Sequence, residues 1–247
     1  MVSARITQIQ ADNPNGYSAS IRTFFAPPGQ QEAGDDEWGA IGAWAWGLSR
    51  AMDYIETDKD IDARKVAING VSRFGKVVMW AGAQDTRFAI TFSGESGCGG
   101  AVIVRRSYGE TVKSITGRFG YWFAKRFKEY ADRVNDLPVD WHDLVALYAP
   151  RPVYIATAEQ DHWGDPRGSF LAAKNADPVY KLFGKVGVGV DEMPKVDIPV
   201  GDFIGYHNRT GTHGQNNYDW EQFLNFADRH LGIKRAAAAA PSSPTTP

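Results

Sequence analysis

Short apolar runs that alternate with amphipathic helical segments constrain the fold of this 247-residue chain more than any other feature. Strands are expected at residues 65–69, 88–93 and 152–158, and helices at 76–83, 121–131, 140–147, 166–183 and 218–231. Residues 184–212 are expected to be irregular. Strands that are separated by helices pair in parallel, so the pattern predicts a mainly parallel sheet covered by helices on both faces, a three-layer α/β sandwich.

The longest helix is expected to begin near Asp36. Its apolar residues recur at spacings of three and four over about 20 residues, which places one stripe against a core. The stripe includes Ile41, Trp44, Ala45, Leu48, Met52 and Ile55. The 35 residues before this helix carry no clear strand.

Composition excludes several classes of protein. The formal net charge is −2 and the basic residues are scattered, which argues against a nucleic-acid partner. Cys98 is the only cysteine, so an internal disulfide and a cysteine-built metal site are excluded. No stretch approaches the ~20 apolar residues of a membrane span, and the first residues lack the apolar core of a signal peptide. We therefore expect no membrane partner.

The domain organisation follows from a change of composition near the end. Residues 1–235 are expected to form the catalytic domain. Residues 236–247 hold five alanines and then a segment of proline, serine and threonine, which predicts a linker or a disordered tail. Such a tail would suit attachment to an additional module.

The sharpest local motif is the segment 70–76, which lies between a predicted strand and a predicted helix. Such a turn can present the hydroxyl of Ser72 as a nucleophile, although Gly75 comes one residue later than in G-x-S-x-G. Two alternatives are a phosphate-binding loop and a simple helix cap by Ser72. The first lacks a magnesium-binding hydroxyl, because Val77 stands in its place.

A nucleophilic serine needs a base, and the base needs an acid that orients it. His213 is the candidate base, because it lies in a loop directly before the final helix. The other histidines are expected to be structural or solvated: His142 and His230 in helical segments, His162 and His207 in loops. Glu95 follows one predicted strand and Asp161 follows the next, and either carboxylate could orient the imidazole.

The motifs resemble those of the glucuronoyl esterases of carbohydrate esterase family 15. Segment 70–76 matches the family motif G-C-S-R-x-G-K except at Val71, and residues 94–97 match its acid-bearing turn. The resemblance runs from about residue 36 to 232 and implies an α/β-hydrolase fold. It implies Ser72 as nucleophile, His213 as base and Glu95 as acid. Asp161 is then the alternative acid, and Arg73 stabilises the oxyanion.

The resemblance also implies a sugar site. Lys76, Glu110 and Trp163 would hold the hydroxyls and the ring of a uronate, whereas Trp122 is expected to be a packing residue. For Glu110 the alternative is a surface salt bridge with Arg105 or Arg106, both close in the sequence. No metal or organic cofactor is required by this chemistry.

The implied function is hydrolysis of esters between lignin alcohols and (4-O-methyl-)glucuronic acid side groups of xylan, through a glucuronoyl-enzyme. The partner would be glucuronoxylan or a lignin–carbohydrate ester, and the location secreted or periplasmic. Alternatives are another carbohydrate esterase, such as an acetylxylan esterase, and a non-catalytic carbohydrate-binding fragment. Only 71 residues precede Ser72, where this fold normally has four strands, so we expect an N-terminally truncated domain.

Overall fold

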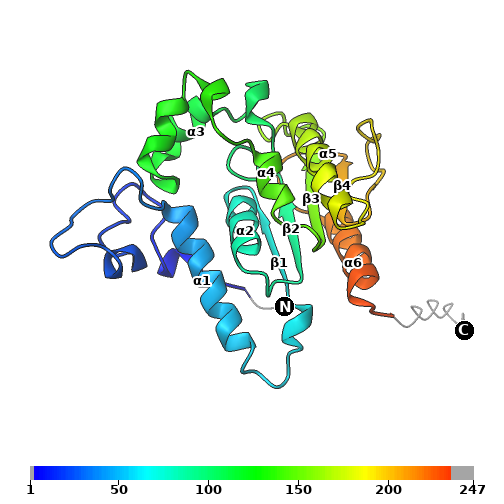
Figure 1. The fold of residues 1–247 in the computed structure, drawn as a ribbon, viewed down its shortest axis with the longest axis horizontal. Coiled ribbons are helices and arrows are strands. Elements are labelled where there is room, and N and C mark those ends of the chain that lie inside the picture. The colour runs from blue at the N-terminus through cyan, green and yellow to red at the C-terminus, as the bar shows by residue number, and fades with distance from the viewer. Residues whose placement is uncertain (1–2, 235–247) are drawn as a thin grey trace, which may run out of the picture.

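The fold is built on a four-stranded parallel sheet, seen in a computed structural model that describes residues 3–234 (Figure 1). Its strands follow the order β1-β2-β3-β4 and comprise Ala67–Val71, Ile90–Gly94, Val153–Ala158 and Ile204–Arg209. All neighbouring strands pair in parallel. The carboxyl ends of the strands therefore meet at one edge, where the loops that carry function lie.

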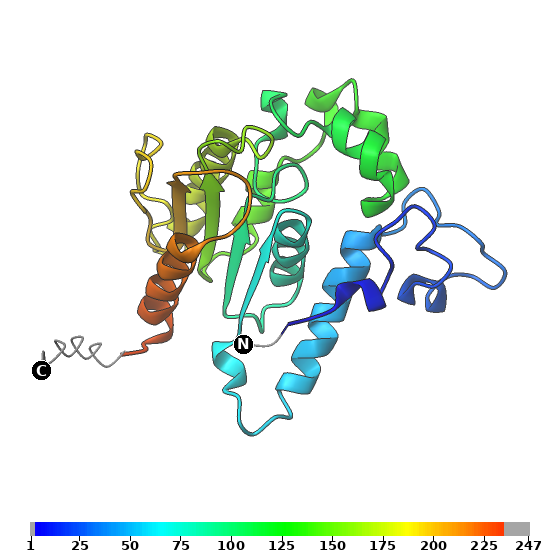
Figure 2. The same ribbon diagram turned by 180° about the vertical axis from the view of Figure 1, so that it is seen from behind.

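Helices cover both faces of this sheet, as predicted. They are α1 Ala40–Ile55, α2 Arg73–Gln84, α3 Val112–Phe119, α4 Trp141–Ala146, α5 Pro166–Leu182 and α6 Asn217–Leu231. Figures 1 and 2 show α2, α4 and α5 on one face and α6 on the other, with α1 packed outside α2. The apolar stripe predicted for the longest helix is buried there, with Trp44 and Met52 almost completely inaccessible. The predicted α/β-hydrolase sandwich is confirmed.

Strand β4 was the main error, because residues 184–212 were expected to be irregular and His207 to lie in a loop. Residues 184–203 and 210–212 are irregular as expected, but residues 204–209 form β4, and the expectation that His207 lies in a loop is wrong. The strand ends in His207, Asn208 and Arg209, which are polar and yet buried. Burial of such side chains is tolerated only when each is hydrogen-bonded. The partners come from distant parts of the chain, so the apolar run that usually announces a buried strand is missing.

One helical prediction also needs correction, and one helix was not predicted. Residues 121–131 form 3₁₀ turns, Gly120–Trp122 and Lys125–Tyr130, in place of one helix. Trp122 stacks on Phe119 at the first of these turns, with ring centroids 4.2 Å apart. Helix α3 was not predicted; it begins where the side chain of Thr111 accepts a bond from the amide of Ser114.

The described residues before α1 contain 3₁₀ turns and no strand, as expected. They lie against α1, where the indole of Trp44 donates to the carbonyl of Gln10 at 2.9 Å. Within residues 3–234 no helix has both the length and the apolar character that crossing a bilayer requires. The predicted linker at 236–247 lies outside the described residues, so the division at residue 235 stays a prediction.

Candidate active site

The four strands each deliver one candidate catalytic residue to the same edge of the sheet. Ser72 directly follows β1 and Glu95 directly follows β2. Asp161 lies in the loop after β3, and His213 lies in the loop between β4 and α6. Parallel pairing thus places residues that are far apart in the sequence at one edge of the sheet. Among the described residues a hydrogen bond joins His213 to Asp161, and none joins Ser72 to His213.

Ser72 occupies a strained turn. Its φ of 59° and ψ of −127° lie in a region that non-glycine residues rarely adopt, which is typical of functional turns. The turn is tight, because a Cβ at Gly70 would lie 2.3 Å from the carbonyl oxygen of Phe74. Ser72 precedes α2 without making a side-chain cap bond, which contradicts the alternative that it merely caps the helix.

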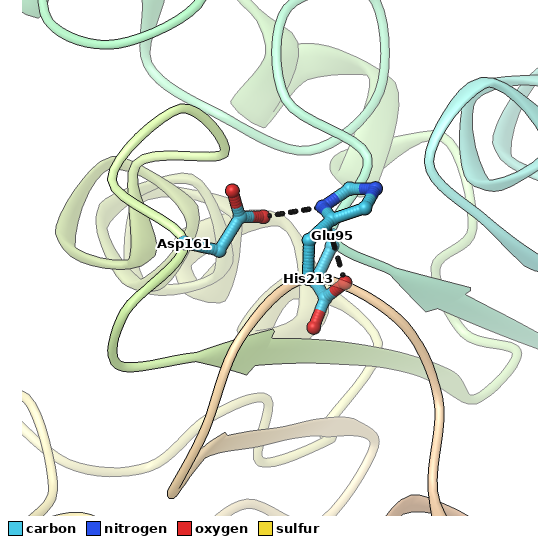
Figure 3. Close-up of side chains that lie close together, drawn as sticks. All are labelled: Glu95, Asp161 and His213. Carbon is cyan, nitrogen blue, oxygen red and sulfur yellow. Dashed lines mark hydrogen bonds and ion pairs between the residues drawn. The ribbon is translucent and has the colours of Figure 1, made fainter.

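His213 lies between two carboxylates, and these three residues are here called the His213 cluster (Figure 3). Its Nδ1 is 2.8 Å from Asp161 Oδ2 and 3.3 Å from Glu95 Oε2. With Nδ1 donating to a carboxylate, Nε2 is left to accept a proton, as a general base requires. The structure therefore brings both candidate acids to the imidazole, and Asp161 makes the shorter contact.

The pKa values of two members of the cluster, His213 and Glu95, are raised. The hydrogen bond to Asp161 raises the pKa of His213; burial opposes this, and the charges of Asp161 and Glu95 reinforce it. Burial raises the pKa of Glu95 to about 7, against the bond from the Gly214 amide and the charges of His213 and Arg209. Nδ1 of His213 and Oε2 of Glu95 are 3.3 Å apart, so the protonation of either group changes the pKa of the other.

A cation is a second chemical possibility for this cluster, since its ligand atoms lie within 4.8 Å of one another. The oxygens of Glu95 are, however, already bound: Oε1 accepts from Arg209 at 2.9 Å and Oε2 accepts from the Gly214 amide at 2.5 Å. A guanidinium beside the carboxylate repels a metal ion. The surroundings therefore favour the acid–base use of these residues.

The predicted sugar-binding residues form one connected group. Lys76 Nζ donates to Glu110 Oε2 at 2.5 Å, and the indole of Trp163 donates to Glu110 Oε1 at 3.0 Å. Lys76 and Glu110 are buried, whereas Trp163 is 41% exposed. The alternative surface salt bridge of Glu110 is wrong, because Arg105 pairs with Asp140 and Arg106 pairs with Asp165.

Arg73 is held by a residue that the sequence did not single out. Its guanidinium pairs with the carboxylate of Asp12, which also accepts bonds from Tyr121 and Trp122, each at 2.8 Å. The guanidinium lies 5.0 Å from the centroid of the Trp122 ring. Trp122 is buried, which confirms its predicted packing role. Among the described residues no hydrogen bond joins Arg73 to Ser72, so its oxyanion role stays a prediction.

Two further residues of the site were missed. Arg209 binds Glu95, and Asp219 binds Arg209. If β4 had been predicted, Arg209 would have been recognised as the last residue of a strand, at the edge of the sheet where the candidate catalytic residues lie. No pattern in the sequence pointed to Asp12, which lies in a polar segment without periodicity.

Several known proteins are similar to this chain in sequence. The family model described as "Glucuronyl esterase, fungi" matches residues 30–184. A carbohydrate esterase from an unknown prokaryotic organism is 49% identical over 217 residues, covering 88% of this chain and 50% of that protein. The 4-O-methyl-glucuronoyl methylesterase of Hypocrea jecorina is 36% identical over 155 residues, covering 59% of this chain and 34% of that protein. The chain thus spans half or less of the length of these relatives.

Solved structures of glucuronoyl esterases are also similar to this chain. A glucuronoyl esterase from Solibacter usitatus is 52% identical, with a TM-score of 0.89, and the match covers 92% of this chain and 58% of that one. A CE15 esterase from a marine bacterial metagenome, described as promiscuous, is 49% identical with a TM-score of 0.82; the match covers 90% of this chain and 56% of that one.

Proposed function

The chain belongs to the glucuronoyl esterase family, and from this premise we propose that it is a serine esterase that hydrolyses esters of (4-O-methyl-)glucuronic acid. The observation that carries the proposal is the His213 cluster, which lies at the sheet edge where the strained turn of Ser72 ends. Acyl transfer needs a nucleophile, a base and an acid that orients the base. The site offers a serine on a tight turn, a histidine with a free nitrogen and two carboxylates.

In the proposed reaction His213 Nε2 accepts the proton of the Ser72 hydroxyl, and the Ser72 oxygen attacks the ester carbonyl. The bond to the alcohol breaks, the alcohol takes the proton from His213, and a glucuronoyl-enzyme remains. Water then attacks this ester by the same route and releases the acid and Ser72. Asp161 holds Nδ1 and stabilises the imidazolium, with Glu95 as a second acid. Arg73 is proposed to stabilise the oxyanion.

Substrate recognition is assigned to Lys76, Glu110 and Trp163. A charged pair offers the donors and acceptors that sugar hydroxyls need, and an exposed indole offers a flat apolar platform for the ring. The names of several relatives, 4-O-methyl-glucuronoyl methylesterases, support a uronate ester as substrate. The same proposal includes a lignin alcohol as the leaving group and glucuronoxylan as the polysaccharide that bears the glucuronate. It also includes a site of action outside the cytoplasm.

The test is hydrolysis of benzyl glucuronate by the chain and by Ser72→Ala, with an acetate ester of the same alcohol alongside. Turnover of the glucuronate ester that vanishes in Ser72→Ala supports both the nucleophile and the substrate. The control Ser18→Ala removes an exposed hydroxyl and should leave the rate unchanged. Faster turnover of the acetate would assign the chain to acetyl esters. Binding of glucuronoxylan oligosaccharides without turnover would make it a binding fragment.

A further inference from the structure

Arg209, the last residue of β4, lies behind the His213 cluster with its side chain 4% exposed. We propose that Arg209 is a positioning residue for the esterase reaction, whose guanidinium holds the loop of His213 and the carboxylate of Glu95 in one arrangement. This inference rests on the proposed function, because it gives the loop a catalytic task.

The first observation is that Arg209 binds the loop on both sides of His213. Its Nη2 is 3.0 Å from the carbonyl oxygen of Thr212 and 2.5 Å from that of Gly214, and its Nη1 donates to Thr210 at 3.0 Å. These bonds limit the movement of a loop that contains glycines with positive φ. Since His213 lies between two bound carbonyls, its backbone is held in place relative to Arg209.

The second observation is that the same guanidinium binds a member of the cluster. Nη2 donates to Glu95 Oε1 at 2.9 Å, while Glu95 Oε2 accepts from the Gly214 amide. Arg209, Glu95 and Gly214 therefore form a closed ring of hydrogen bonds. This ring fixes where Glu95 lies relative to Nδ1 of His213 and leaves Asp161 as the nearer acid.

The third observation is that Arg209 is itself anchored. Its Nε donates to Asp219 Oδ2 at 2.8 Å, and Asp219 Oδ1 lies 2.9 Å from His207 Nε2. Asp219 also accepts the amide of Asn216 and so fixes the first turn of α6. Burial alone would raise the pKa of Asp219, but the bonds from His207 and Asn216 and the charge of Arg209 lower it. The guanidinium thus connects β2, β4 and α6.

The test is Arg209→Lys, which keeps the charge. A single ammonium cannot reproduce the fork that reaches Asp219, Glu95 and the loop carbonyls together. We expect kcat on benzyl glucuronate to fall by about tenfold to a hundredfold, the range expected for misplaced catalytic groups, with KM little changed. Hydrogen exchange of the amides of residues 210–216 should accelerate, while the rest of the chain exchanges as before.

The control is Arg229→Lys, an exposed arginine of α6 that also donates to backbone carbonyls, those of Gly201 and Asp202. It should leave kcat, KM and exchange at 210–216 unchanged. Unchanged kcat in folded Arg209→Lys would overturn the proposal, as would faster exchange throughout the chain in place of the loop alone. If the unsubstituted chain does not turn over, the proposed function fails while the exchange experiment still tests the placement of the loop. Should Arg209→Lys not fold, Asp219→Asn loosens the anchor and should give the same local pattern.

Discussion

Trp163 illustrates how one side chain serves two tasks in the proposed sugar site. Its indole N–H is used by Glu110, and the guanidinium of Arg118 lies 5.7 Å from its ring centroid. The residue still keeps 41% of its surface exposed. A large aromatic side chain with that exposure, fixed at its polar end, is a platform for an apolar sugar face.

Replacement of Trp163 by alanine should therefore weaken binding and leave the chemistry intact. We expect KM for benzyl glucuronate to rise about tenfold, which corresponds to about 1.4 kcal/mol, with kcat changed much less. Hydrolysis of the matching acetate ester should be unaffected. Trp80→Ala is the control, because Trp80 is almost equally exposed, at 40%, and no hydrogen bond joins it to Glu110 among the described residues. Equal losses on both esters would mean that Trp163 supports the fold and does not bind the sugar.

At the scale of elements, the junction between α2 and β2 sets the position of the nucleophile. A Cβ at Gly75 would lie 2.7 Å from the carbonyl oxygen of Gly94 and 2.9 Å from the Cβ of Ser96. The start of α2 can approach the sheet this closely only because residue 75 has no side chain. The late glycine of the 70–76 motif is thus explained by helix–strand packing.

Gly75→Ala should push α2 away from β2. We expect the free energy of unfolding to fall by about 1–3 kcal/mol, as for other overpacked sites, and kcat to fall with it because Ser72 moves. Urea unfolding and esterase kinetics measure the two effects. Gly117→Ala is the matched change, since Gly117 lies exposed in α3 with no atom within 4 Å of the added Cβ. It should stabilise the chain by up to about 1 kcal/mol; a similar gain at Gly75 would contradict the packing argument.

The elements that the sequence predicted well are those whose signal is local. Strands β1 to β3 are apolar runs, and α1 is a periodic stripe, so a window of residues suffices to find them. The contacts that were missed are long-range and polar. Arg73 and Asp12 are 61 residues apart, and Arg209 and Glu95 are 114 apart. No spacing rule links such pairs, and the polar second half of β4 was missed because its residues are buried through contacts of this kind.

At the scale of the whole molecule, we expect activity and stability to respond to pH in opposite directions. His213 must be neutral to accept the proton of Ser72. Because its pKa is raised above 6.5, kcat/KM should increase as the pH rises through that raised value. The proposed reaction therefore favours the alkaline side of the ordinary histidine range.

The stability of the folded chain should fall over the same range. The pKa of Glu95 is about 7 in the folded chain, against an ordinary value of 4.5, so between these values the folded state holds a proton that the unfolded state has released. The free energy of unfolding must then decrease as the pH rises through this window. His213 acts with the same sign above pH 6.5, whereas burial lowers the pKa of His230, which acts the other way.

The contribution of Glu95 can be isolated by comparing the chain with Glu95→Gln in urea between pH 4.5 and 7.5. The variant loses a titrating group, so its free energy of unfolding should decline less steeply with pH than that of the unsubstituted chain. The altered bond to Gly214 lowers the free energy of unfolding by the same amount at every pH and does not change this slope. Parallel curves would mean that Glu95 titrates at its ordinary value and that its burial is fully compensated by Arg209. A decline that is steeper in the unsubstituted chain than in Glu95→Gln would show that ionised Glu95 destabilises the fold. This loss of stability would occur at the pH where His213 becomes neutral and can act as a base.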